Sequence, residues 1–302
     1  MKALICYNPY SGKQAFERDL PYVNLRLKEK YDEVIVFRSV APKSITTFIK
    51  NFAVDFDLIL IAGGDGSLNE AINGIMTLNY RPKIAYIPYG TVNDVGHMLK
   101  LNNSIEKTMD IILEGNKVEM DICKIDDRYF TYACAAGSFT NVSYEASSRL
   151  KKTFGRMAYF IEAAKEISLD QRMNLTIETN DQVITGTYYV VMALNSKRLA
   201  GFRIHRREKT KLNDGIIDLT LLSMAKFKMS VFRLIFFFLF GEKYKYGMDY
   251  IKTGKFKLKS DKPLNFNVDG EFAFTANEIN LEVCPRAIDF IVNKKVYKQY
   301  FQ

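Results

Sequence analysis

Histidine and tryptophan are almost absent from this sequence. Its 302 residues include two histidines, no tryptophan and four cysteines. With so few histidines and no cysteine pair spaced C-x-x-C, a metal site built from cysteine and histidine is not expected. Cys6, Cys123 and Cys284 stand in apolar runs of strand type. They predict buried, reduced thiols, as in a cytosolic protein.

Apolar stretches long enough to cross a membrane are lacking as well. Residues 234–240 form an apolar run of seven residues, too short to span a bilayer. The run predicts either a core helix or an apolar surface that contacts acyl chains. No signal peptide precedes the first expected strand, which begins at Ala3.

The excess of basic residues lies entirely in the second part of the chain. Residues 1–120 hold 14 basic and 14 acidic residues, whereas residues 121–302 hold 29 and 20, which accounts for the net charge of +9. The asymmetry predicts an anionic partner for the second part. Because no nucleic-acid-binding motif is found, we expect a membrane surface and no nucleic acid.

The first part alternates strands with amphipathic helices. Its expected strands are residues 3–7, 33–38, 58–62 and 84–87. Repeated strand–helix units with short links predict an α/β domain with a mostly parallel sheet.

After residue 116 the pattern changes to strand-like runs, interrupted by helical blocks at 142–168 and 226–240. Few crossovers predict an antiparallel, sandwich-like domain. We expect a first domain at 1–122 and a β-rich second domain at 123–286. The end of the chain, about 287–302, returns to the first domain in this prediction.

A glycine-rich turn follows the third strand. Gly63, Gly64, Asp65 and Gly66 end an apolar run, and a helical pattern begins at once. Such a turn at the carboxyl end of a buried strand is where α/β sheets bind phosphate. The aspartate favours a metal ion or a nucleotide that carries one. The alternative is a tight turn without a ligand.

Two further turns follow other strands of the same sheet. Asn8-Pro9-Tyr10-Ser11-Gly12-Lys13 follows the first strand, and Pro88-Tyr89-Gly90-Thr91-Val92-Asn93-Asp94 follows the fourth. Each alone is equally consistent with an ordinary turn before a helix, with Asn93 or Asp94 as a cap. Because all three turns reach one edge of a parallel sheet, together they favour a phosphate-binding site.

These three motifs, followed by Asp269-Gly270-Glu271, resemble the soluble bacterial diacylglycerol kinases. That family belongs with the eukaryotic diacylglycerol, sphingosine and ceramide kinases, and the resemblance spans nearly the whole chain. It implies a nucleotide-binding first domain, a lipid-substrate second domain, and ATP and Mg²⁺ as cofactors.

The resemblance also implies residue roles. The expected ATP contacts are Asn8, Pro9, Ser11, Gly12, Lys13, Ser39, Gly64, Asp65, Gly66, Ser67, Leu68, Asn69, Glu70 and Thr91. It implies that Asp65 acts through magnesium, with Asp121 as a second carboxylate of that metal network, and that Glu271 is the general base. It also implies a structural magnesium site formed by Asp214 and the carbonyl groups of Lys211 and Ile216. Taken without the resemblance, Asp269 with Gly270, and Asp214 with Gly215, are equally consistent with plain turns.

The sequence thus predicts an ATP-dependent lipid kinase that converts diacylglycerol to phosphatidic acid. We expect it in the cytoplasm, peripherally associated with the inner face of an anionic membrane. A homodimer is one of the oligomeric states that we consider. The alternatives are an enzyme similar to NAD kinase, which shares the Gly-Gly-Asp-Gly turn, and a lipid- or nucleotide-binding module without activity.

Overall fold

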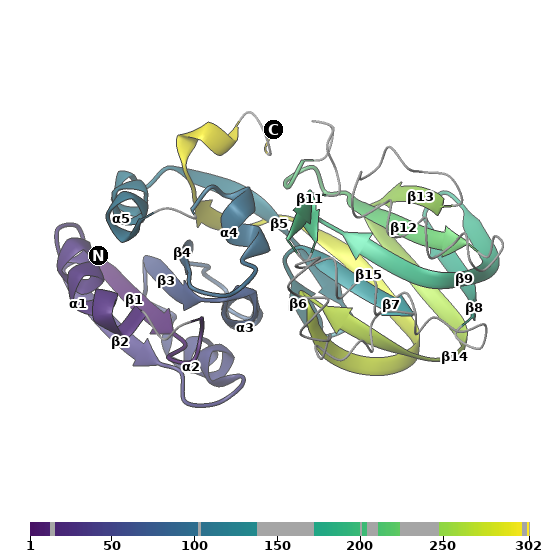
Figure 1. The fold of residues 1–302 in the computed structure, drawn as a ribbon, viewed down its shortest axis with the longest axis horizontal. Helices are drawn as coiled ribbons and strands as arrows, with labels where there is room; N and C mark the ends of the chain where they lie inside the picture. Colours follow the sequence, from purple (N-terminus) through teal and green to yellow (C-terminus); the bar gives the residue numbers. More distant parts are fainter. Residues whose placement is uncertain are drawn as a thin grey trace, which may run out of the picture. The chain divides into compact units, whose positions relative to one another are not determined.

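The computed structural model describes residues 1–12, 16–101, 104–137, 172–199, 201–203, 211–223, 248–297 and 301. The helical blocks expected at 142–168 and 226–240, including the apolar run at 234–240, lie outside these residues, as does Lys13. The chain divides into two compact units (Figure 1). Unit 1 comprises Met1–Thr131, Arg207–Gly215 and Val283–Gln302, and unit 2 comprises Tyr132–Arg206 and Ile216–Glu282.

Unit 1 is built on parallel strands. They are β1 (Lys2–Tyr7), β2 (Glu33–Arg38), β3 (Leu58–Gly63), β4 (Lys83–Pro88) and the end of β15 (Glu271–Ile291). Their order is β15-β4-β3-β1-β2, and each neighbouring pair is parallel. β5 (Lys117–Ile125) and β6 (Arg128–Phe130) form an antiparallel hairpin in the same unit.

The helices of unit 1 follow the strands in turn. They are α1 (Phe16–Leu27), α2 (Ser44–Phe52), α3 (Asp65–Ile75), α4 (Asp94–Met98) and α5 (Ile105–Glu114), with a 3₁₀ turn η3 (Lys294–Val296) near the end of the chain. α1 and α5 cover one face of the sheet, because their apolar residues share one buried cluster with alternate residues of β1, β3 and β4. α2 contacts α3 closely at Gly74, where a Cβ atom would lie 2.8 Å from Cβ of Ile49.

Unit 2 is antiparallel throughout its described part. Its strands are β7 (Ala133–Gly137), β8 (Met173–Thr179), β9 (Val183–Leu194), β12 (Ile217–Ser223), β13 (Met248–Thr253), β14 (Lys255–Val268) and the first part of β15, with a small hairpin of β10 (Arg198–Leu199) and β11 (Phe202–Arg203). β7 and β8 lie end to end between β9 and β14, since both pair with each of them.

Two expectations need correction. The mostly parallel sheet is limited to β1–β4 and the end of β15, whereas the β5–β6 hairpin in the same unit is antiparallel. Cys284, expected to be buried, is only half-buried, because it lies beyond the last residue of β15 that pairs with β14. Cys6, Cys123 and Cys134 are buried, as expected for Cys6 and Cys123.

The compact units also divide at other positions than the sequence suggested. The expected boundary after residue 122 falls inside β5, whereas the units divide after Thr131. The physical reason is the β5–β6 hairpin, in which Cys123 pairs with Phe130 and keeps both strands in unit 1. The segment Arg207–Gly215 also belongs to unit 1.

Candidate active site

Two glycine-containing turns touch at one edge of the sheet in unit 1. β3 and β4 are parallel neighbours, so their carboxyl ends lie at the same edge. A Cβ atom on Gly90 would lie 2.5 Å from Cα of Gly64, and a Cβ atom on Gly64 would lie 3.3 Å from Cα of Gly90. The backbones after β3 and β4 therefore come as close as glycine alone permits.

The turn after β1 joins the same cluster. Gly12 has a φ of 59°, and a Cβ atom there would collide with the carbonyl oxygen of Tyr89, in the turn after β4. A Cβ atom on Gly63 would lie 2.5 Å from Oγ of Ser67 and 3.4 Å from Oγ of Ser11. The two serine hydroxyl groups thus border one glycine, although they come from different turns.

Asn8 shapes the turn after β1. Its Oδ1 accepts a hydrogen bond of 2.9 Å from the backbone N–H of Tyr10, and its carbonyl oxygen accepts one of 3.2 Å from the N–H of Ser11. Pro9 between them is buried. Asn8 and Pro9 therefore define the path of the backbone that presents Ser11 and Gly12.

Asn93 fixes the turn after β4 from within. Its Oδ1 accepts the N–H of Gly90 at 2.9 Å and the hydroxyl group of Tyr86 at 3.2 Å, while its Nδ2 donates to the Gly90 carbonyl at 2.6 Å. Its φ of 52° lies in the left-handed region, which asparagine tolerates. The Tyr86 hydroxyl group also lies 3.2 Å from the carbonyl oxygen of Gly63. This buried tyrosine therefore connects the end of β3 to the turn after β4.

The Asp65 carboxylate is held at the start of α4. Its Oδ2 accepts the N–H of Asp94 at 3.1 Å, and its Oδ1 accepts the N–H of Val95 at 3.4 Å. The positive end of a helix favours a negative charge at this place. Asn93 occupies the N-cap position of α4 but makes no side-chain cap, so the expected local cap is replaced by a carboxylate from α3.

Asp94, the first residue of α4, is fully buried. Burial raises the pKa of Tyr86 well above its usual range, and the charges of Asp65 and Asp94 raise it further. Both carboxylates therefore act on this buried hydroxyl group through their charge. Carboxylate oxygens are the ligands that Mg²⁺ prefers, so each of the two residues suits a magnesium ion by its donor chemistry.

The side chains of two expected ATP contacts form hydrogen bonds within unit 1. Glu70 caps α2, because its carboxylate oxygens accept the N–H groups of Lys43 at 2.8 Å and Ile45 at 3.2 Å. Asn69 donates through Nδ2 to the carbonyl oxygen of Tyr129 on β6, at 3.1 Å. These bonds position α3 and leave ATP contact by the two side chains as a prediction.

The remaining expected contacts differ in what they present. The Leu68 side chain is fully buried, so Leu68 offers only backbone groups. Ser39 is buried, with its Oγ 2.8 Å from Oγ of Ser44. Thr91 is exposed beside Gly90.

Asp121 joins two segments of unit 1, the loop at Gly215 and strand β15 at Arg286. Its Oδ2 accepts the N–H of Gly215 at 2.7 Å and its Oδ1 accepts the N–H of Arg286 at 2.7 Å. Burial raises the pKa of Asp121, and the charge of Asp214 raises it further, against the effect of the two N–H groups. Within the described residues no group of three or more His, Cys, Asp and Glu could hold a metal ion. The role of Asp121 in the catalytic metal network and the structural magnesium site of Asp214, Lys211 and Ile216 stay predictions.

In unit 2, Glu271 is exposed and is the first residue of β15. Asp269 and Gly270 close the hairpin between β14 and β15, as the alternative interpretation of this motif supposed.

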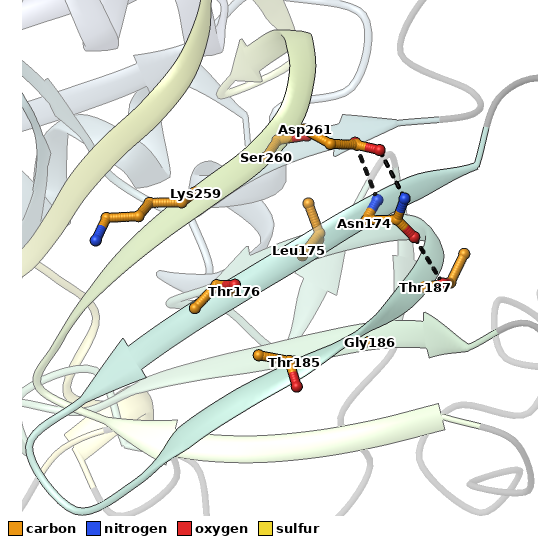
Figure 2. Close-up of a pocket in the computed structure, with 9 residues that line it drawn as sticks. All are labelled: Asn174, Leu175, Thr176, Thr185, Gly186, Thr187, Lys259, Ser260 and Asp261. Carbon is orange, nitrogen blue, oxygen red and sulfur yellow. Dashed lines mark hydrogen bonds between the residues drawn. The ribbon is translucent and has the colours of Figure 1, made fainter.

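A pocket of about 490 Å³ lies over β8, β9 and β14 in unit 2 (Figure 2). Its Asp261 carboxylate accepts two hydrogen bonds from Asn174, at 3.1 and 2.6 Å. Its Lys259 forms an ion pair of 2.9 Å with Glu178. These charges are compensated within the sheet, and no expected site residue lines the pocket. The candidate active site is therefore the cluster of turns in unit 1.

Comparisons with known proteins agree with this assignment. Residues 2–125 match the family model of the diacylglycerol kinase catalytic domain. A diacylglycerol kinase of Staphylococcus carnosus is 34% identical over 285 residues, covering 93% of this chain and 92% of the relative. One of Staphylococcus haemolyticus is 34% identical over 301 residues, covering 98% and 90%. The chain belongs to the diacylglycerol kinase family.

Membership in this family makes the chain an ATP-dependent lipid kinase. The fold agrees: the crystal structure of a diacylglycerol kinase from Bacillus anthracis str. Sterne aligns with a TM-score of 0.76 at 20% identity, covering 98% of both chains. In the described residues, no helix has the length and apolar character needed to cross a bilayer.

Sequence reasoning missed the residues that support this kinase site. From the sequence, Tyr86 was indistinguishable from the other apolar residues of β4, although its hydroxyl group bonds the carbonyl oxygen of Gly63. The hydrogen bonds from the Asn93 side chain to the backbone of Gly90 were not predicted either. A usable signal is the Asn-Asp pair shortly after Gly90, since asparagine is among the few residues that favour a left-handed backbone.

Gly90→Ala tests the contact between the two turns. The new Cβ would meet backbone, so we expect a loss of about 1–3 kcal/mol in the free energy of unfolding and a raised KM for ATP. Thermal unfolding and ATP-dependent kinetics measure both effects. The control is Gly186→Ala, whose Cβ would meet the side chain of Tyr188. An unchanged KM for ATP in Gly90→Ala would contradict a role of this contact in nucleotide binding.

Proposed function

We propose that the chain transfers the γ-phosphoryl group of Mg·ATP to the hydroxyl group of diacylglycerol, producing phosphatidic acid. The names of the similar Staphylococcus proteins support diacylglycerol as the acceptor. The observation that carries the proposal is the Asp65 carboxylate, fixed at the start of α4 beside the contact of Gly64 with Gly90.

In this proposal the turns after β1, β3 and β4 bind the phosphates of ATP. α3 begins after Gly64, which has no side chain to accept the first N–H groups of the helix. These donors, the positive end of α3 and the hydroxyl groups of Ser11 and Ser67 suit a phosphate group. Lys13 and Thr91 are the proposed further contacts.

Asp65 and Asp94 are the residues that would hold Mg²⁺. The ion would offset the negative charge of the phosphoryl group during transfer. Asp65 is already oriented by two N–H groups, so its carboxylate needs little reorganisation to contribute. A structural Mg²⁺ at Asp214, with carbonyl groups of Lys211 and Ile216, is a separate proposal.

Glu271 is the proposed general base. The acceptor oxygen attacks the γ-phosphorus, the bond to the bridging oxygen of ADP breaks, and the hydroxyl proton passes to the Glu271 carboxylate. An exposed carboxylate at the tip of a hairpin can approach a lipid hydroxyl group without crowding it.

The acceptor lies in a membrane, so we further propose that the kinase binds a membrane surface peripherally, at its inner face in the cytoplasm. The net charge of +9 supports attraction to anionic lipid. A homodimer remains a prediction.

The acceptor is tested with radiolabelled ATP and separated products. We expect label in phosphatidic acid when mixed micelles contain diacylglycerol and Mg²⁺, and none when EDTA removes the metal. Parallel assays offer a sphingoid base and NAD as acceptors. If only NAD were labelled, the enzyme would be an NAD kinase and the proposal would be wrong. If only the sphingoid base were labelled, the enzyme would be a lipid kinase with a sphingoid base, and not diacylglycerol, as its acceptor.

The roles of the carboxylates are tested by Asp65→Asn and Glu271→Gln. Each is expected to lower kcat by about 10²–10⁴-fold, since one loses a charge at the phosphates and the other loses the base. Asp55→Asn and Glu282→Gln, exposed carboxylates in units 1 and 2, are the matched controls. A kcat within a few-fold of wild type for either test variant would remove the role assigned to that residue.

A further inference from the structure

The hairpin that precedes Glu271 has a defined conformation. Asp269 and Gly270 have φ values of 48° and 89°, and Val268 pairs with Glu271. Two residues with positive φ between antiparallel strands are typical of a type I′ turn, for which Asp-Gly is a favoured sequence. The turn makes Glu271 the first residue of β15.

Asp269 does more than this turn requires. Its side chain is only 4% exposed, and its Oδ1 accepts the backbone N–H groups of Tyr132 at 3.0 Å and Ala133 at 3.1 Å. Its backbone N–H donates to the carbonyl oxygen of Ala133 at 2.8 Å. The hydroxyl group of Tyr132 donates to its carbonyl oxygen at 3.0 Å. Four hydrogen bonds therefore tie the turn to the start of β7.

A buried carboxylate is costly unless it is hydrogen-bonded. A type I′ turn needs only residues that accept a positive φ, and an exposed Asn or Gly meets that need. The burial of the Asp269 carboxylate against β7 thus indicates that the hairpin has to be held in one position. The exposed Glu271, two residues further along the chain, is held with it.

We propose that Asp269 is a positioning residue for Glu271. It anchors the hairpin on β7, through the N–H groups of Tyr132 and Ala133 and the hydroxyl group of Tyr132, and thereby holds the first residue of β15. The inference rests on the proposed function, in which Glu271 takes the hydroxyl proton.

Asp269 itself is unsuited to take the proton. Asp269 is buried and its Oδ1 already accepts two backbone N–H groups, so its carboxylate is not presented to a substrate hydroxyl group. A general base has to lie within hydrogen-bond reach of the proton, and a displacement of about 1 Å can cost roughly 100-fold in rate. A loosened anchor should therefore lower kcat and leave the binding of ATP unchanged.

Three variants separate the anchor from the base. Asp269→Asn keeps an oxygen acceptor and tolerates positive φ, so we expect kcat within about threefold of wild type. Asp269→Gly keeps the freedom of φ but removes the acceptor, and we expect kcat to fall about 10–100-fold with the KM for ATP within about twofold. Tyr132→Phe removes one hydroxyl group and should lower kcat by about 3–10-fold.

The pH profile of kcat gives a readout that a purely structural defect would not produce. The loss of rate on the acidic side, which reports the base, is expected to persist in Asp269→Asn and Asp269→Gly and to disappear in Glu271→Gln. Asp261→Gly is the matched control, because Asp261 lies on β14, the strand that leads into the turn, and like Asp269 accepts hydrogen bonds from a neighbouring segment. It should retain the wild-type kcat.

Each outcome decides the inference. An Asp269→Asn variant as inactive as Glu271→Gln would make Asp269 the base and overturn it. A wild-type kcat in Asp269→Gly, with Glu271→Gln inactive, would overturn the anchor and leave the proposed function intact. A wild-type kcat in Glu271→Gln would remove the base from the proposed function, and the inference with it. If thermal unfolding shows that Asp269→Gly does not fold, Tyr132→Phe decides by the same criteria.

Discussion

The contact between the backbones of Gly64 and Gly90 is the constraint on which the candidate site depends. Parallel pairing of β3 with β4 brings the ends of the strands together, but any side chain at Gly90 would push the turns apart. Asn93 and Tyr86 hold the second turn in the conformation that permits the contact. With the turns in place, Asp65 reaches the N–H groups at the start of α4. Close backbone packing thus sets the position of the charged group.

Both units contain carboxylates that stabilise the fold through hydrogen bonds to the backbone. Carboxylates that shape the fold accept backbone N–H groups from a distant segment: Glu70 caps α2, Asp121 joins a loop to β15 and Asp269 ties a hairpin to β7. Each resembles a candidate for chemistry when only its residue type is considered. Their bonds show what they stabilise. Glu271 is exposed in unit 2, and the hydroxyl groups of Ser11 and Ser67 border Gly63 in unit 1.

The turns of the candidate site could be located from the sequence, whereas the hydrogen bonds that stabilise them could not. Glycines and an aspartate at the end of an apolar strand are typical of a phosphate-binding turn, so Gly64, Asp65 and Gly90 could be located without a structure. The sequence did not show that the β5–β6 hairpin belongs to the first domain, because strand-like runs have the same pattern on both sides of the boundary. The resemblance assigned Glu70 and Asn69 to ATP. Their hydrogen bonds to Lys43 and Tyr129 could not be predicted, because these partners are distant in sequence. Hydrogen bonds between distant segments leave no local pattern.

Hydrogen–deuterium exchange with and without Mg·ATP tests the central claim most directly. The account predicts slower exchange of backbone N–H groups in residues 63–68 and 89–95 when Mg·ATP is bound, because the phosphates would occupy the turns that contain Gly64 and Gly90. Residues 174–187 of unit 2, which border the pocket of compensated charges, should be unaffected. Unchanged exchange in both turns at saturating Mg·ATP, or protection confined to residues 174–187, would contradict the account.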